Sequence, residues 1–185
     1  MNAAAVAPRA LALFVDAVER TPPEAWDRTS NLGEWSVREL VGHATGSADK
    51  LVRLSERGEF GGFSEPADYF CDDPAARLRE IQQRLREVLG AADLEAPCSS
   101  PQGEVPLRRA MSFPVADLAI HSWDLHRSRG ADAELPEDVL VFCREMVDAI
   151  PDEVMRRPGS FGPARPAPES ATPTARLMAH LGREV

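Results

Sequence analysis

Apolar residues recur every three or four positions over most of the chain, which is the spacing of the buried side of an amphipathic helix. Five segments show this pattern. Their apolar positions are Leu11, Phe14, Val15 and Val18; Val37, Leu40, Val41, Ala44, Ala48, Leu51 and Val52; Leu78, Ile81, Leu85, Val88 and Leu89; a stretch from about Leu107 to Arg129; and Val139, Phe142, Met146 and Ile150. A short helix is predicted from about Thr174 to Leu181, with Thr172 as its cap. Only the region around 98–105 hints at a strand. The pattern predicts an all-α protein.

Residues that start or stop helices separate these segments. The clearest is Ser36-Val37-Arg38-Glu39, a capping box in which the first and last side chains satisfy each other's backbone amides. Pro114 either kinks the fourth helix or marks its true start. The other boundaries are Thr21-Pro22-Pro23, Gly58 to Gly62, Asp73-Pro74, Gly130 and Pro136. Residues 91–103 are polar and are predicted to be a loop that crosses the fold.

The predicted architecture is a helical bundle with long connections, which allow crossovers between helices. A chain of 185 residues is expected to form one domain with a core of its own. We expect residues 1–157 to form the bundle. Residues 158–185, a Pro- and Gly-rich tail with a short helix, are expected to pack on the same domain.

The net charge of the chain limits the classes of molecule that it is expected to bind. The chain has 30 acidic and 21 basic residues and a net charge of −9, which argues against nucleic acid and against an anionic membrane surface. No run approaches the roughly 20 apolar residues of a membrane span, and the N-terminal segment lacks a signal-peptide pattern. The cysteines Cys71, Cys98 and Cys143 are widely spaced, as expected of free thiols in a reducing compartment. We therefore expect a cytoplasmic protein with a small-molecule partner.

Three residues carry the candidate chemistry. Asp117 and His121 are four apart on the fourth helix, so they project from one face. His43 lies at the edge of the apolar stripe of the second helix. If these two helices face each other, the three side chains form a facial set of two imidazoles and a carboxylate, which suits a catalytic divalent metal. The alternative is that the histidines are ordinary core or surface residues and that Asp117 only orients His121.

Neighbouring residues also admit two interpretations. Asp124 either accepts a hydrogen bond from a ligand histidine or binds the N-terminus of a nearby helix. His126 is expected at the surface or at a pocket rim, with a proton-transfer role if the helix kink turns it inward. Trp35 and Trp123 either wall a pocket or pack in the core, and core packing is the commoner use. His180 is expected to be exposed.

Other motifs are excluded. Gly58-Glu59-Phe60-Gly61-Gly62 lacks the Lys-Ser/Thr and the preceding strand of a phosphate loop. No Gly-x-Ser-x-Gly elbow occurs, and no cysteine is placed beside a histidine as a nucleophile. The arginines Arg77, Arg79, Arg84 and Arg86 alternate with glutamates and are predicted to form a solvated helix face.

Three segments carry a resemblance to a known family. Glu34 to His43, with the sequence EWSVRELVGH, resembles the Trp-Thr-Val-Arg-Asp-Leu-x-x-His segment of the DinB-like superfamily. Asp117 to Leu125, DLAIHSWDL, resembles its second signature. The tail segments Pro158 to Pro163 and Leu177 to Arg183 are similar to the end of an actinobacterial branch. That branch carries the N-terminal domain type of mycothiol-dependent maleylpyruvate isomerase.

The resemblance implies an up-down-down-up four-helix bundle that holds a divalent metal, often zinc or nickel. His43, Asp117 and His121 fall on the ligand positions. Characterised relatives include thiol-dependent isomerases and S-transferases that use mycothiol or bacillithiol, and bundles of this kind often pair as homodimers. The isomerase has a glutamate where Asp117 stands and a separate C-terminal domain, so its substrate is not carried over.

Three functions follow as hypotheses. The first is a metal-dependent S-transferase or thiol-assisted isomerase that uses a mycothiol-like thiol against a small electrophile. Asp124 would then orient a ligand imidazole and His126 would move a proton. The second is a metal hydrolase or lyase that activates water. The third is a non-catalytic protein that binds a small ligand in the bundle.

Overall fold

The computed structural model describes residues 2–62, 64–100, 103–156 and 160–185. Its α-helices are α1 (Ala3–Glu19), α2 (Val37–Arg57), α3 (Pro74–Leu89), α4 (Leu107–Ala110), α5 (Ser112–Ser128), α6 (Glu137–Asp148), α7 (Asp152–Met155) and α8 (Pro173–His180). Two 3₁₀ turns, η1 (Pro23–Ala25) and η2 (Pro66–Tyr69), and a hairpin of β1 (Pro97–Ser100) and β2 (Gly103–Pro106) complete it. The protein is mostly helical, as the sequence predicts.

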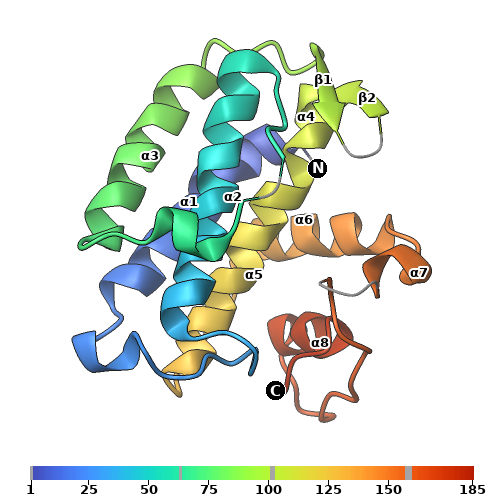
Figure 1. The fold of residues 1–185 in the computed structure, drawn as a ribbon. Helices are drawn as coiled ribbons and strands as arrows, with labels where there is room; N and C mark the ends of the chain where they lie inside the picture. The colour runs from blue at the N-terminus through green and yellow to red at the C-terminus, as the bar shows by residue number, and fades with distance from the viewer. Residues whose placement is uncertain (1, 63, 101–102, 157–159) are drawn as a thin grey trace.

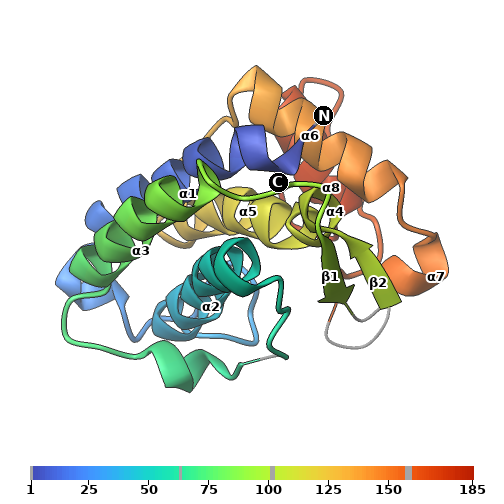
Figure 2. The ribbon, with the colours of Figure 1, turned by 90° about the horizontal axis from the view of Figure 1, so that it is seen from above.

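Four helices form the bundle. The helices α1 and α2 each pack against both α3 and α5, so they occupy opposite corners (Figure 2). Figure 1 shows that α1 and α5 run in one direction while α2 and α3 run in the other. This is the up-down-down-up path implied by the family resemblance. Because α2 and α3 run in the same direction, the connection between them returns along the length of the bundle. The connections between α1 and α2 and between α3 and α5 each join helices at opposite corners.

The helix starts follow the local chemistry of the chain. The capping box forms at α2: Ser36 Oγ accepts the Glu39 amide at 3.2 Å, and Glu39 Oε2 accepts the Ser36 amide at 2.8 Å. A cap of this kind is worth about 1 kcal/mol. At α8 the predicted cap is also present, since Thr172 Oγ1 accepts the Ala175 amide at 3.1 Å.

The fourth predicted helix is divided in two. The break between α4 and α5 falls at Met111, three residues before Pro114. Pro114 therefore stands in the first turn of α5, where a missing backbone N–H costs no helical hydrogen bond. Of the two alternatives for Pro114, the structure selects the true start of a helix.

Two short strands lie in the region around 98–105, where the sequence hints at a strand, so the predicted crossing loop is regular in part. Strand β1 lies within residues 91–103 and pairs antiparallel with β2, with Cys98 opposite Val105. Cys98 is buried, and this one inward side chain is too little to give a clear alternating pattern. Helix α7 was likewise not predicted, because four residues are too few to show a helical period.

The C-terminal tail packs on the helical bundle. In the described residues 160–172 the structure has no helix or strand, as the Pro- and Gly-rich composition indicates. The predicted boundary between residues 157 and 158 lies outside the described residues. The tail is attached to the bundle by the contact of α8 with α6 and by the Leu135 amide, which donates to Thr174 Oγ1 at 3.1 Å.

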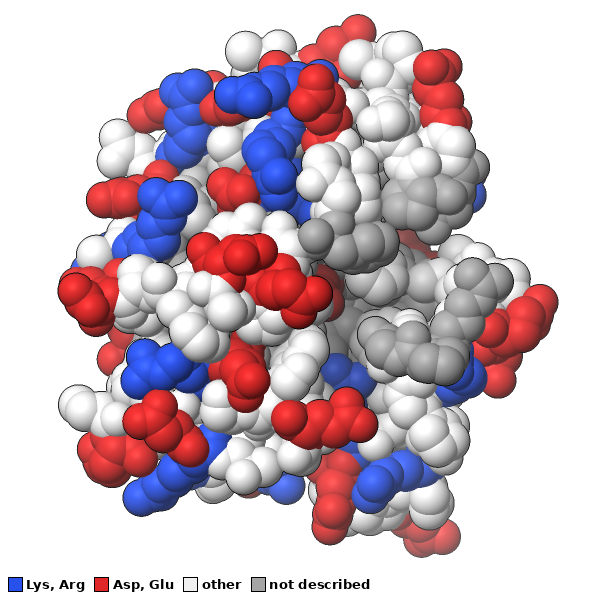
Figure 3. Space-filling model, viewed as in Figure 1, with Lys and Arg blue, Asp and Glu red and all other residues white. Residues whose placement is uncertain are grey.

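Surface charges are interleaved. On the face shown in Figure 3, acidic and basic side chains alternate without a broad basic patch among the described residues. On α3, all four arginines are exposed, as predicted for a solvated face, and three of them pair with glutamates. The pairs are Arg77–Glu80, Arg79–Glu19, Arg84–Glu56 and Arg84–Glu87. Among the described residues, no helix is both long and apolar enough to cross a bilayer.

Two glycines let η2 lie directly on α2. A Cβ added at Gly42 would lie 2.3 Å from the carbonyl oxygen of Pro66, and one at Gly46 would lie 3.0 Å from the Tyr69 ring. Tyr69 Oη also donates to Asp49 Oδ2 at 3.1 Å. Because Gly42 precedes His43, this close packing also holds the part of α2 that carries the candidate site.

We expect Gly42→Ala to lower the free energy of unfolding by about 1–2 kcal/mol. Overpacking against a backbone carbonyl costs about 1–3 kcal/mol or more, which outweighs a helix-propensity gain of about 1 kcal/mol. The matched control is Gly90→Ala, where φ is −65° and the nearest atom would be 3.8 Å away. Urea unfolding measures both. A Gly42→Ala protein as stable as the wild type would contradict the close packing of η2.

Candidate metal centre

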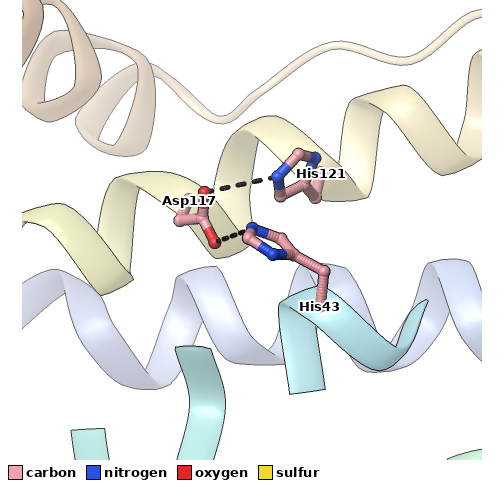
Figure 4. A group of neighbouring side chains, drawn as sticks. All are labelled: His43, Asp117 and His121. Atoms are coloured by element: carbon pink, nitrogen blue, oxygen red, sulfur yellow. Dashed lines mark ion pairs between the residues drawn. The ribbon is translucent and has the colours of Figure 1, made fainter. Parts of the chain in front are cut away.

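The site lies between α2 and α5, at the middle of the bundle. His43 projects from α2, and Asp117 and His121 project from consecutive turns of α5 (Figure 4). Asp117 stands between the two imidazoles: its Oδ2 lies 3.3 Å from His43 Nε2, and its Oδ1 lies 3.3 Å from His121 Nε2. The structure therefore brings together the three residues that the sequence singled out.

The donor set fits a divalent metal. One nitrogen or oxygen atom from each side chain lies within 4.8 Å of the others. Ligand atoms at about 2.1 Å from a tetrahedral ion are about 3.4 Å apart. Each imidazole lies at a similar distance, 3.3 Å, from one oxygen of Asp117, although the two contacts use different oxygens of the carboxylate. Two imidazoles and one carboxylate are ligands that zinc and nickel both accept, and three protein ligands leave positions open. The three side chains could therefore hold an ion without a movement of α2 or α5.

Burial is uneven across the site. The side chain of His43 is 33% exposed, whereas those of Asp117 and His121 are 9% and 6% exposed. Access to the site is therefore along the His43 side. Trp35, from the loop before α2, covers part of this side, with its ring centre 4.7 Å from that of His43 and 6.4 Å from that of His121.

Trp35 and Trp123 have different roles: Trp35 forms a wall of the site, and Trp123 packs in the core. Trp35 is partly buried and lies against both imidazoles, so it forms a wall of the site as well as packing on the core. Trp123 is 3% exposed and belongs to the core, with the Arg127 guanidinium 5.6 Å from its ring centre. The sequence favoured core packing for both, and the structure corrects this for Trp35.

Asp117 has a further partner. Ser47, one turn after His43 on α2, donates its hydroxyl to Asp117 Oδ2 at 2.6 Å. Burial alone would raise the pKa of Asp117, but the electrostatic attraction and hydrogen bonds of the neighbouring His121 and His43 rings hold it well below its usual value. Asp117 is thus an ionised carboxylate fixed by groups on both helices.

Asp124 accepts a hydrogen bond from the back of the site. His121 Nδ1 lies 3.0 Å from Asp124 Oδ2, which is the first of the two alternatives considered for this residue. Burial lowers the pKa of His121, but Asp117 and Asp124 together outweigh it and raise the value to about 9. Because Nδ1 faces Asp124, Nε2 faces Asp117 and the open side of the site.

His126 lies elsewhere. Its Nδ1 is 2.7 Å from Arg129 Nη2, and Arg129 Nη1 donates to the Arg20 carbonyl at the end of α1. Burial and the charges of Arg129 and Arg20 lower the pKa of His126. His126 is five residues from His121 and therefore lies on a different face of α5, and its ring points toward Arg129 and away from the site. We assign His126 no part in the chemistry. His180 is exposed, as predicted.

The structure adds residues that the sequence did not single out. Ser47 and Lys50 share the face of α2 that carries His43, at spacings of four and seven residues, and this periodicity is the signal that points to them. Lys50 is 9% exposed, with Nζ 4.1 Å from the Phe60 ring centre. Burial lowers its pKa, against the opposing charge of Asp117. Arg183 and Asn31 also reach the site, and no local pattern indicates them.

The cysteines stand apart from this chemistry. Cys71, Cys98 and Cys143 are all free thiols. Burial raises the pKa of Cys98, and that of Cys143 to about 12, so both remain protonated at neutral pH.

The fold and the site together define a DinB-like helical domain with a candidate His–Asp–His metal centre. The chain belongs to the mycothiol maleylpyruvate isomerase N-terminal domain family, whose model matches residues 7–126. That range includes all three candidate ligands. No curated protein matches the sequence.

Two solved structures are similar to the chain. They are the mycothiol-dependent maleylpyruvate isomerase and a histidine-to-alanine mutant of it. Each has a TM-score of 0.57 and 18% sequence identity, over 76% of this chain and 65% of that chain. At this identity the likeness shows the shared fold, and the chain matches less than two thirds of the isomerase's length.

The electrostatics of the metal-free site predict how stability depends on pH. A histidine whose pKa rises from 6.5 to about 9 on folding contributes stability that is complete below pH 6.5 and is lost as pH rises through 9. We expect the melting temperature of the protein in chelator to fall between pH 6.5 and 9, and His121→Gln to remove most of this dependence. A wild-type profile without such a fall would contradict the assignment of charge to His121.

Proposed function

We propose that this protein is a metal-dependent enzyme that acts on a small electrophilic molecule, as an S-transferase or a thiol-assisted isomerase. Zinc or nickel is the proposed metal, and a mycothiol-like thiol is the proposed co-substrate. The observation that carries the proposal is the convergence of His43, Asp117 and His121 on one point, open on the His43 side. Membership of the family and the thiol dependence named for the similar isomerase support the choice of a thiol.

Each residue has a distinct part in this proposal. His43, Asp117 and His121 would hold the ion, and Ser47 fixes the carboxylate between the two rings. A divalent ion held there would stabilise the thiolate form of a thiol, which is the nucleophile needed to attack an electrophilic carbon. Trp35 presents an aromatic wall beside His43, where an apolar part of a substrate would pack. Asp124 keeps the His121 ring in its orientation from the buried side.

The charge of the molecule is consistent with a small-molecule partner. Acidic and basic side chains are interleaved on the face in Figure 3, and the net charge is −9. A nucleic-acid partner would require a basic surface. Maleylpyruvate itself is not part of the proposal, because the chain matches only 65% of the isomerase's length.

Metal content is the first test. We expect the wild-type protein, purified without a His-tag, to hold about one zinc or nickel ion per chain, and His121→Ala to lose it. His180→Ala is the matched control, because His180 is exposed at the end of α8. Elemental analysis measures all three. If the wild type retains no metal after incubation with zinc or nickel, the enzyme proposal fails and a ligand-binding bundle takes its place.

Thiol binding is the second test. In the cobalt-substituted protein, a mycothiol-like thiol is expected to produce a sulfur-to-cobalt charge-transfer band and to raise the melting temperature. The control is the corresponding S-methylated thiol, which cannot form a thiolate. An unchanged spectrum, together with ester or lactone hydrolysis that needs no thiol, would replace this proposal with a hydrolase that uses activated water.

A further inference from the structure

The C-terminal segment places a buried arginine against the candidate site from behind. Arg183 is 8% exposed, and its guanidinium meets Asp124 in a two-point contact: Nε lies 3.2 Å from Oδ1, and Nη2 lies 3.0 Å from Oδ2. Its remaining nitrogen, Nη1, donates to the Leu181 carbonyl at 2.9 Å. All three guanidinium nitrogens are therefore used, and 59 residues of sequence separate the two partners.

The end of α8 is shaped to aim this side chain. The Arg183 amide donates to the Met178 carbonyl and the Gly182 amide to the Ala179 carbonyl, each at 2.9 Å. This is the Schellman arrangement, which requires a residue with positive φ, and Gly182 has a φ of +88°. A Cβ at Gly182 would also lie 2.9 Å from the backbone of Gly162, so the turn is locked between two parts of the tail.

The aromatic ring of Phe161 also helps to position the Arg183 side chain. The guanidinium carbon lies 5.2 Å from the centre of the Phe161 ring, in the same tail. Arginine stacks on aromatic faces while its edge makes planar, two-point contacts with carboxylates. The face of the Arg183 guanidinium thus packs on Phe161 of the tail, and its edge forms hydrogen bonds with Asp124 of α5.

Asp124 transmits this contact to the site. Its carboxylate is fully buried and also accepts Asn31 Nδ2 at 3.1 Å and His121 Nδ1 at 3.0 Å. An ionised carboxylate only accepts hydrogen bonds, so the His121 Nδ1 proton lies in this contact. Arg183 supplies two of the four hydrogen bonds that fix the carboxylate. Without them, the Asn31 amide would be the remaining side-chain donor that holds the Asp124 carboxylate in place against the His121 ring.

We propose that Arg183 is a positioning residue of the candidate metal centre: through Asp124 it holds the His121 ring with Nδ1 protonated and Nε2 directed at Asp117. The proposal rests on the proposed function, since Nε2 matters there as a metal ligand. It also implies that the C-terminal segment, outside the family match over residues 7–126, completes the site. Groups that orient a ligand histidine commonly account for a 10–100-fold difference in metal affinity.

The test compares three tail variants in the full-length protein. Arg183→Met is expected to weaken zinc binding by roughly 10–100-fold in a chelator competition. Arg183→Lys is expected to fall between this variant and the wild type, because an ammonium keeps the charge but not the two-point contact. Arg165→Gln is the charge-matched control: Arg165 is an exposed tail residue whose side chain pairs with Glu184 at 3.7 Å. It should bind zinc as the wild type does.

A second readout is independent of zinc. The His121 Nδ1–H, buried in its bond to Asp124, should give a slowly exchanging proton signal in ¹H–¹⁵N spectra of the metal-free wild type. That signal should exchange faster or disappear in Arg183→Met, recover in part in Arg183→Lys and persist in Arg165→Gln.

Two results would overturn the proposal. One is the absence of a slowly exchanging His121 Nδ1–H signal in the wild type. This measurement does not depend on whether any variant folds. The other is unchanged protection in folded Arg183→Met or, if that variant does not fold, in Arg183→Lys. A wild type that takes up no zinc would instead refute the proposed function, while the proton signal would still decide the role of Arg183.

Discussion

The placement of charge inside the bundle is the constraint on which this structure depends. Asp117 and Asp124 are both buried on α5, and neither carboxylate would be tolerated there without partners. Their partners come from every side: His43 and Ser47 from α2, Asn31 from the loop before it, and Arg183 from the tail. His121 lies between the two acids. Segments that are far apart in the sequence therefore have to meet at α5.

This arrangement also explains the two environments around His121. On one side, Asp124 and Arg183 form a dry, fully bonded pair whose geometry is set by the end of α8. On the other, Asp117 and His43 face the partly exposed side of the site. A buried ion pair contributes little net stability, because desolvation offsets most of the attraction, but it fixes geometry where a functional ring must be oriented.

The sequence predicted those features that repeat or that lie close together along the chain. The apolar spacing of the long helices, the capping box at Ser36 and the four-residue step from Asp117 to His121 are local, and all three are present. Helix α1 extends further than its periodicity indicated, because residues 3–10 are mostly alanine and give no contrast between faces. The choice of partner for Asp124, the orientation of Trp35 and the contact of Arg183 depend on tertiary packing. No spacing along the chain encodes them.

The contact between Trp35 and His43 has a consequence for observing the protein in solution. An indole ring that touches an imidazole loses fluorescence when the imidazole becomes charged and changes its emission when the imidazole is immobilised. Trp35 is the tryptophan that lies against both rings of the site, while Trp123 is in the core beside Arg127. The third tryptophan, Trp26, lies beside Arg38. The part of the intrinsic emission that comes from Trp35 therefore reports on occupancy of the site without an added label.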